Sequence, residues 1–164
     1  MGGERTVGKP GRGSENKVPC VCAVQTTEDK QAVLACLSLR PFTNQAMTKL
    51  AAQSLALPAS AISTGLPCFA SLVVNGGVHQ RTFTGCGKAA SALPQFATVN
   101  TFLGSLKTAM TGAHHAIDFK KYGHRYFAAF QYRFDRRFNP SIVLKRLVIA
   151  VPQTNRPSTP ALGC

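Results

Sequence analysis

Residues 118–138 carry aromatic side chains at the spacing of one helix face, and this pattern constrains the fold more than any other. The aromatic residues on that face are Phe119, Tyr122, Tyr126, Phe127, Phe130 and Phe134. The basic residues that lie largely off it are Lys120, Lys121, Arg125, Arg133 and Arg136. The pattern predicts an amphipathic helix over 118–138 that packs its aromatic face on a core. Its basic side is the better candidate for a surface that contacts phosphates.

Two short apolar runs near the start of the chain predict a β-hairpin. Residues 18–25 (VPCVCAVQ) and 31–39 (QAVLACLSL) have the composition of buried strands. The polar residues Glu28 and Asp29 lie between them, where a turn is expected.

The remaining patterns alternate between strand and helix. Thr43 can cap a helix that ends before Pro58. The elements expected after it are a strand at 60–64, a helix-like stretch at 66–73, a short strand within 73–84 and a helix at 95–110 that Gly112 ends. The sequence therefore predicts a mixed α/β domain over 1–140, in which the glycine-rich residues 1–17 form a loop. Residues 141–164 are expected to be a basic, apolar segment and a disordered tail.

The charge balance indicates a polyanionic partner. The chain has 19 Lys and Arg against 6 Asp and Glu, which gives a net charge of +13. Nucleic acid is the commonest polyanion in a cytoplasm, although an RNA-associated protein would show the same sign. No apolar run is long enough to span a bilayer, since Lys145 and Arg146 interrupt the longest, and the N-terminus does not have the pattern of a signal peptide. We expect a cytoplasmic protein that does not contact membranes.

The cysteines do not have the spacing of a zinc site. None of the six forms a CxxC pair, and no His lies at a ligand interval from them. We expect buried thiols in a reducing compartment.

A family pattern runs through three stretches of the chain in a fixed order. These are 1–24 (MGGERTVGKPGRGSENKVPCVCAV), 57–69 (LPASAISTGLPCF) and 96–138 (FATVNTFLGSLKTAMTGAHHAIDFKKYGHRYFAAFQYRFDRRF). Together they resemble the ISXO-type insertion-sequence transposases, a DDE-class group, over about residues 1–140. The resemblance implies a ribonuclease-H-like mixed sheet with flanking helices. It also implies DNA transposition, with strand cleavage and transfer in the family.

The family's catalytic positions carry few metal ligands in this chain. The family reaction is a displacement at phosphorus assisted by Mg²⁺ or Mn²⁺, which carboxylates hold. The resemblance places the third metal ligand at Asn100, and a basic DNA-contacting residue at Lys107 on the same helix face. It places the second catalytic Asp at Thr64. It places the first catalytic Asp upstream of Gly2, on the central first strand of the family's sheet, and we expect both that Asp and that strand to be missing. No Asp or Glu lies between Lys30 and Ile117. We therefore expect neither bound metal nor catalysis from this chain, unless translation starts upstream of Met1.

Two alternatives stay open beside an inactive transposase. The chain could be a non-catalytic basic protein that binds nucleic acid, or that inhibits a full-length transposase through mixed oligomers. It could also be a pseudogene product that folds poorly. The expected partners are DNA, a full-length transposase or a second copy of the chain. The expected DNA contacts are Lys107, Lys120, Lys121, Arg125, Arg133, Arg136 and Arg137, with His79 and Arg81 at a basic pair of the family. The neighbouring His114 and His115 are expected to be loop residues.

Overall fold

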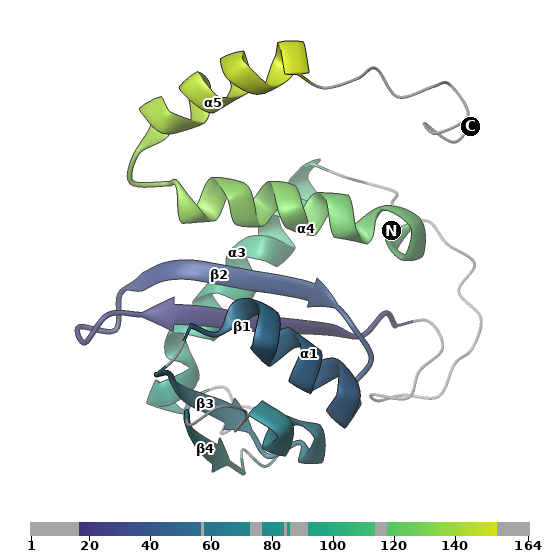
Figure 1. Ribbon diagram of the computed structural model, residues 1–164, viewed down its shortest axis with the longest axis vertical. Helices are drawn as coiled ribbons and strands as arrows, with labels where there is room; N and C mark the ends of the chain where they lie inside the picture. The colour runs from purple at the N-terminus through teal and green to yellow at the C-terminus, as the bar shows by residue number, and fades with distance from the viewer. Residues whose placement is uncertain are drawn as a thin grey trace.

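The protein is a mixed α/β domain whose helices lie around two small sheets (Figure 1). The computed structural model describes residues 17–56, 58–72, 77–83, 85, 92–113 and 118–153. The strands are β1 (Cys20–Thr26), β2 (Ala32–Leu39), β3 (Ser60–Thr64) and β4 (Val78–Thr82). The α-helices are α1 (Asn44–Ser54), α3 (Ala97–Ala113), α4 (Phe119–Asp135) and α5 (Pro140–Gln153). Two 3-10 turns, η1 (Pro67–Leu72) and η2 (Pro94–Phe96), connect them.

The predicted hairpin is confirmed. Strands β1 and β2 pair antiparallel, with Cys20 opposite Leu39 and Val24 opposite Ala35. The backbone of Thr27 closes the turn, because its N–H donates to the carbonyl of Gln31 at 2.9 Å. The strand boundaries differ from the predicted ones by one or two residues, as is usual at element ends.

The ribonuclease-H-like sheet that the resemblance implied, without its central first strand, is not confirmed among the described residues. Strands β3 and β4 pair parallel, from Ser60 opposite Val78 to Thr64 opposite Thr82. They make a second two-stranded sheet, separate from the hairpin. The mixed α/β class is confirmed, whereas a ribonuclease-H-like sheet would need a strand that joins the two pairs. No such strand is present in the part of the chain that the structure describes.

Helices α3 and α4 cover the hairpin and share an aromatic core. Phe102 of α3 is only 2% exposed. Its ring meets Phe130 and Phe134 of α4 edge-on, at centroid distances of 5.4 and 4.6 Å. Phe127 is also buried and packs edge-on against Phe119 at 5.3 Å. The aromatic stripe predicted from the sequence therefore faces the core, as expected.

Helix α3 does not end where the sequence predicted. It starts after the turn η2 and continues through Gly112 to Ala113. A glycine in a helix costs only about 1 kcal/mol relative to alanine. The burial of Phe102 and Leu106 on the same helix stabilises it by more than that.

Side chains of α4 and of the residues just after it form hydrogen bonds with backbone groups at the outer edge of β2. The backbone N–H of Ala35 donates to Asp135 Oδ1 at 2.9 Å, and the N–H of Leu37 donates to Gln131 Oε1 at 3.1 Å. Arg137 donates to the carbonyl of Ala32. The other edge of β2 is paired with β1, so both edges of this strand have partners. Such cover prevents an edge strand from pairing with another chain.

A second, smaller core lies under α1. Met47 is fully buried and packs with Leu50, Val21 and Cys68, which brings α1 against the hairpin and η1. Thr43 caps the helix as predicted, because its side chain accepts a hydrogen bond from the Ala46 N–H at 3.3 Å.

Replacing this cap is expected to destabilise the domain. Thr43→Ala should lower the free energy of unfolding by about 1 kcal/mol, because the first turn of α1 loses a hydrogen-bond acceptor. Urea unfolding followed by circular dichroism measures the change. Thr48→Ala, at an exposed position of the same helix, is the control and should have little effect. Equal losses in the two variants would contradict the capping role.

Residues 140–153 form helix α5, to which the sequence analysis assigned no element. The helix has no buried residue, and Leu144, Leu147 and Val148 are more than half exposed. No helix among the described residues is both long and apolar enough to cross a membrane. The predicted loop at 1–16 and the predicted tail beyond Gln153 lie outside the described residues.

Candidate nucleic-acid interface

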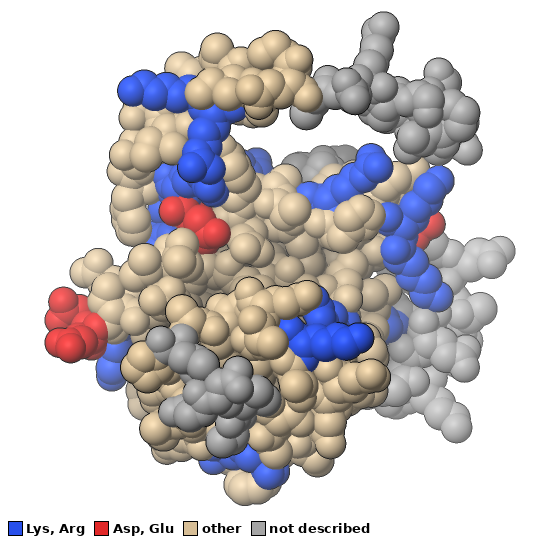
Figure 2. Space-filling model, in the orientation of Figure 1, with Lys and Arg blue, Asp and Glu red and all other residues tan. Residues whose placement is uncertain are grey.

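The N-terminal half of α4 presents a basic face to solvent. Asp118 begins the helix, because its carboxylate accepts a hydrogen bond from the Lys121 N–H at 3.1 Å. Lys121 and Arg125 are exposed on the side of the helix opposite the aromatic stripe, and Lys120 is exposed at the flank of the stripe. We call these three residues the α4 basic face. Within the described residues none of the three forms an ion pair with a carboxylate. Figure 2 shows blue side chains distributed over the helices on the drawn face, with little red among them.

The arginines at the end of α4 are held against the protein itself. Arg136 lies over the ring of Tyr132 at 3.9 Å and donates to its carbonyl at 3.2 Å. Arg137 lies over Phe134 at 3.8 Å and bonds the edge of β2. Both are half-buried, whereas Arg133 is exposed. Of the three arginines that the sequence suggested, only Arg133 has a largely solvent-exposed side chain.

His79 and Arg81 lie on β4 and bond the β3 side of the small sheet. His79 Nε2 is 2.8 Å from Ser63 Oγ, which belongs to β3. Burial and then the charge of Arg81 lower the pKa of His79, so the ring is neutral near pH 7. Arg81 donates to the carbonyl of Gly65 at 3.2 Å and its guanidinium lies 5.4 Å from the Phe83 ring centre. Both side chains therefore have partners within the domain.

The residues at the family's catalytic positions lie on two elements. Thr64 is half-buried at the end of β3. Asn100 and Lys107 are exposed on α3, and their seven-residue separation in one continuous helix places them on the same face. His114 and His115 lie outside the described residues.

The donor atoms at these positions do not fit a divalent metal ion. Magnesium and manganese prefer carboxylate oxygens, whereas Thr64 offers a hydroxyl and Asn100 an amide. Within the described residues, no three side chains of His, Cys, Asp or Glu come together in a way that could hold a metal. Asp135, which lies in the family-like Arg-Phe-Asp-Arg-Arg segment, is bonded to the edge of β2.

The hairpin carries three cysteines, Cys20 and Cys22 on β1 and Cys36 on β2. Burial, followed by the neighbouring Cys20 and Cys36, raises the pKa of Cys22 to about 12. Without a bound metal ion, a thiol with such a pKa stays protonated at neutral pH. Cys20, Cys22 and Cys36 are half-buried and Cys68 is buried. Cys86 and Cys164 lie outside the described residues.

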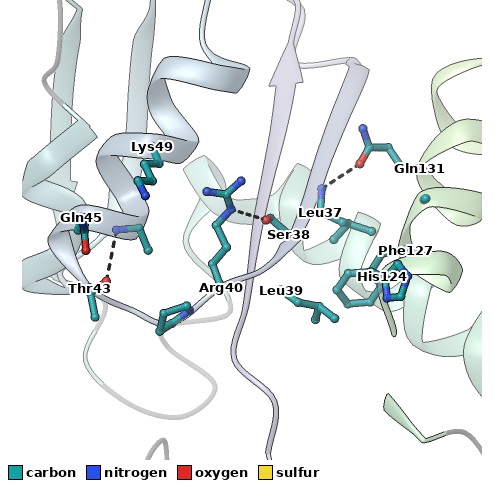
Figure 3. Close-up of a pocket in the computed structure, with 13 residues that line it drawn as sticks. Leu37, Ser38, Leu39, Arg40, Thr43, Gln45, Lys49, His124, Phe127 and Gln131 are labelled. Atoms are coloured by element: carbon teal, nitrogen blue, oxygen red, sulfur yellow. Dashed lines mark hydrogen bonds between the residues drawn. The ribbon is translucent and has the colours of Figure 1, made fainter. Parts of the chain in front are cut away.

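A groove between β2, α1 and α4 holds basic residues that the sequence analysis missed. It has a volume of about 560 Å³, and Arg40, Lys49 and His124 line it (Figure 3). Arg40 follows β2, Lys49 lies on α1 and His124 lies on α4, so the three come from distant parts of the sequence. We call these three residues the groove residues. No local spacing relates them, and only the packing of α4 against β2 could have indicated their proximity.

The fold and this surface define a small basic α/β domain suited to a polyanionic partner. Comparison with known families identifies the family of this domain. The family model of the ISXO2-like transposase domain matches residues 1–135. The chain belongs to this family of insertion-sequence transposases, which supports a transposition-related function and interaction with DNA. No curated protein and no solved structure matches the chain. Helix α5 lies beyond the matched residues.

Proposed function

We propose that this chain is a transposase-derived domain that binds DNA through the α4 basic face and does not itself cleave DNA. The observation that carries the proposal is the exposure of Lys120, Lys121 and Arg125 on the first two turns of α4 without ion-pair partners among the described residues. Cations that are not neutralised by the protein can neutralise phosphates and release counterions, which drives binding. The net charge of +13 attracts DNA to this face from a distance.

The absence of cleavage follows from the side chains at the family's catalytic positions. Displacement at phosphorus with two metal ions requires carboxylates that hold the ions beside the reacting groups. Thr64 is not a carboxylate, Asn100 carries no charge, and the sequence between Lys30 and Ile117 contains no Asp or Glu. A protein with these donors can hold DNA, and its effect on transposition is then to occupy the DNA rather than to cut it.

The test combines binding with cleavage on mixed-sequence duplex DNA. Fluorescence anisotropy over a range of salt concentrations, with EDTA present, should show binding that weakens steeply as salt rises. The same DNA incubated with Mn²⁺ should stay intact on a denaturing gel. Lys120→Gln/Lys121→Gln/Arg125→Gln should reduce the slope of log K against log salt by about 3.

The matched control removes the same three charges elsewhere. Lys30→Gln/Lys145→Gln/Arg146→Gln changes the hairpin turn and α5, and should leave the salt slope close to that of the parent protein. Equal effects of the two triple variants would overturn the assignment to the α4 basic face. Cutting that depends on Mn²⁺ and is lost in Asn100→Ala would overturn the proposal that the chain does not cleave.

A further inference from the structure

The groove residues are positioned for an anion that lies between α1 and α4. Arg40 is fixed at the end of β2, because its Nε donates to Ser38 Oγ at 2.8 Å and its Nη2 donates to Gln53 Oε1 at 2.6 Å. Its Nη1 makes no hydrogen bond within the described residues. A guanidinium held in this way loses little side-chain entropy when its remaining donors bind a ligand.

The other two groove residues have no competing partners among the described residues. Lys49 and His124 make no hydrogen bond or ion pair within the described residues, and both are exposed. In Figure 3 Lys49 lies on the α1 side and His124 on the α4 side, with Arg40 between them. No Asp or Glu lines the groove, so its positive charge is not cancelled locally. Helix α1 also begins at the groove and has no acidic residue in its first turn, which adds to the positive potential there.

One residue of the α4 basic face lies beside the groove. Lys120 precedes His124 by one helical turn, about 5.4 Å along the axis, so the two residues lie on the same side of α4. Lys49 and Arg40 in the groove, with Lys120 one turn before His124, therefore form a track of positive charges. A track of this kind favours a ligand with repeated negative charges over a single small anion. Apolar side chains of Leu37, Leu39 and Phe127 line the groove beside the cations, where less polar sugar groups can lie.

We propose that this groove binds the phosphodiester backbone of a DNA strand, through Arg40, Lys49 and His124. The inference rests on the proposed function, because it assigns a place on the protein to the DNA that the α4 basic face attracts. Phosphate oxygens accept hydrogen bonds from the open guanidinium nitrogen of Arg40 and from the ammonium of Lys49, and His124 contacts the strand as it passes to α4. Such contacts fix the position of the DNA without reading its sequence.

Two charge-matched double variants distinguish DNA binding in the groove from the general electrostatic attraction between the protein and DNA. Arg40→Gln/Lys49→Gln removes one Arg and one Lys from the groove, whereas Lys145→Gln/Arg146→Gln removes the same pair from exposed positions of α5. On a fluorescein-labelled duplex at fixed salt, the groove variant should bind about tenfold more weakly and lose about 2 from the salt slope. The α5 variant should bind within about twofold of the parent protein. Lys49→Gln alone breaks no hydrogen bond and should still weaken binding.

A footprint on the unaltered protein gives a readout that does not depend on a variant folding. Acetylation of lysines with and without duplex DNA, read by mass spectrometry, should show protection of Lys49 and Lys120 but not of Lys145. Equal acetylation of Lys49 in both samples, or equal loss of affinity in the two double variants, would overturn the assignment of the DNA to the groove. The proposal that the protein binds DNA would still stand. Groove-dependent binding of polyglutamate in place of DNA would overturn it in favour of an acidic protein partner. Absence of any DNA binding by the parent protein would overturn the proposed function as well.

Discussion

Phe102→Ala should lower the free energy of unfolding by about 3–5 kcal/mol, the largest loss that we expect from one substitution. The ring is 2% exposed and meets both Phe130 and Phe134, so its removal leaves a cavity at the contact of α3 with α4. A domain of this size has a total stability of about 5–15 kcal/mol. The variant should therefore unfold at a much lower urea concentration than the parent protein, as circular dichroism would show.

A second phenylalanine provides the control. Phe138 is 79% exposed, and Phe138→Ala should change the free energy of unfolding by about 0.5 kcal/mol or less. If the two variants unfolded at the same urea concentration, the aromatic contact between α3 and α4 would not be the main core of this domain.

Removing the cover from the edge of β2 should cause both destabilisation and aggregation. In Gln131→Leu/Asp135→Leu the N–H groups of Leu37 and Ala35 lose their acceptors, at a cost of about 2–4 kcal/mol in total. The uncovered edge can then pair with the same edge of another molecule. Urea unfolding measures the first effect, and light scattering during incubation at 37 °C measures the second.

Asp135→Asn is the matched control for the edge. The asparagine carbonyl can still accept the hydrogen bond from Ala35, so this variant should lose less stability and stay as soluble as the parent protein. A double leucine variant as stable and as soluble as the parent protein would show that the two bonds contribute nothing.

The elements that could be predicted from the sequence are those defined by local patterns. The hairpin follows from two apolar runs around a polar turn, and α4 follows from aromatic residues at a spacing of three and four. The N-cap at Thr43 has a local signal of the same kind. The separation of the strands into two sheets has no local signal, because it depends on which strands meet across the chain.

Some basic residues at α4 are exposed and others are held by the protein, and local spacing could not show which are which. Lys120 and Arg137 are both basic residues at α4, yet the first is exposed and the second is held by Phe134 and by β2. The difference arises where α4 meets the hairpin, about one hundred residues away in the sequence. For the same reason Arg40, Lys49 and His124 were not recognised as a group before the fold was known.

The bonds between β2 and α4 also impose an order of events during synthesis. Ala35 and Asp135 are separated by 100 residues. A ribosome adds about 5–20 residues per second, so the nascent hairpin waits about 5–20 s for the helix that covers its edge. During this interval its open N–H groups can capture another growing chain on the same messenger RNA. The yield of correctly assembled protein therefore depends on the translation speed of the middle of the message and on chaperones that hold the hairpin until α4 emerges.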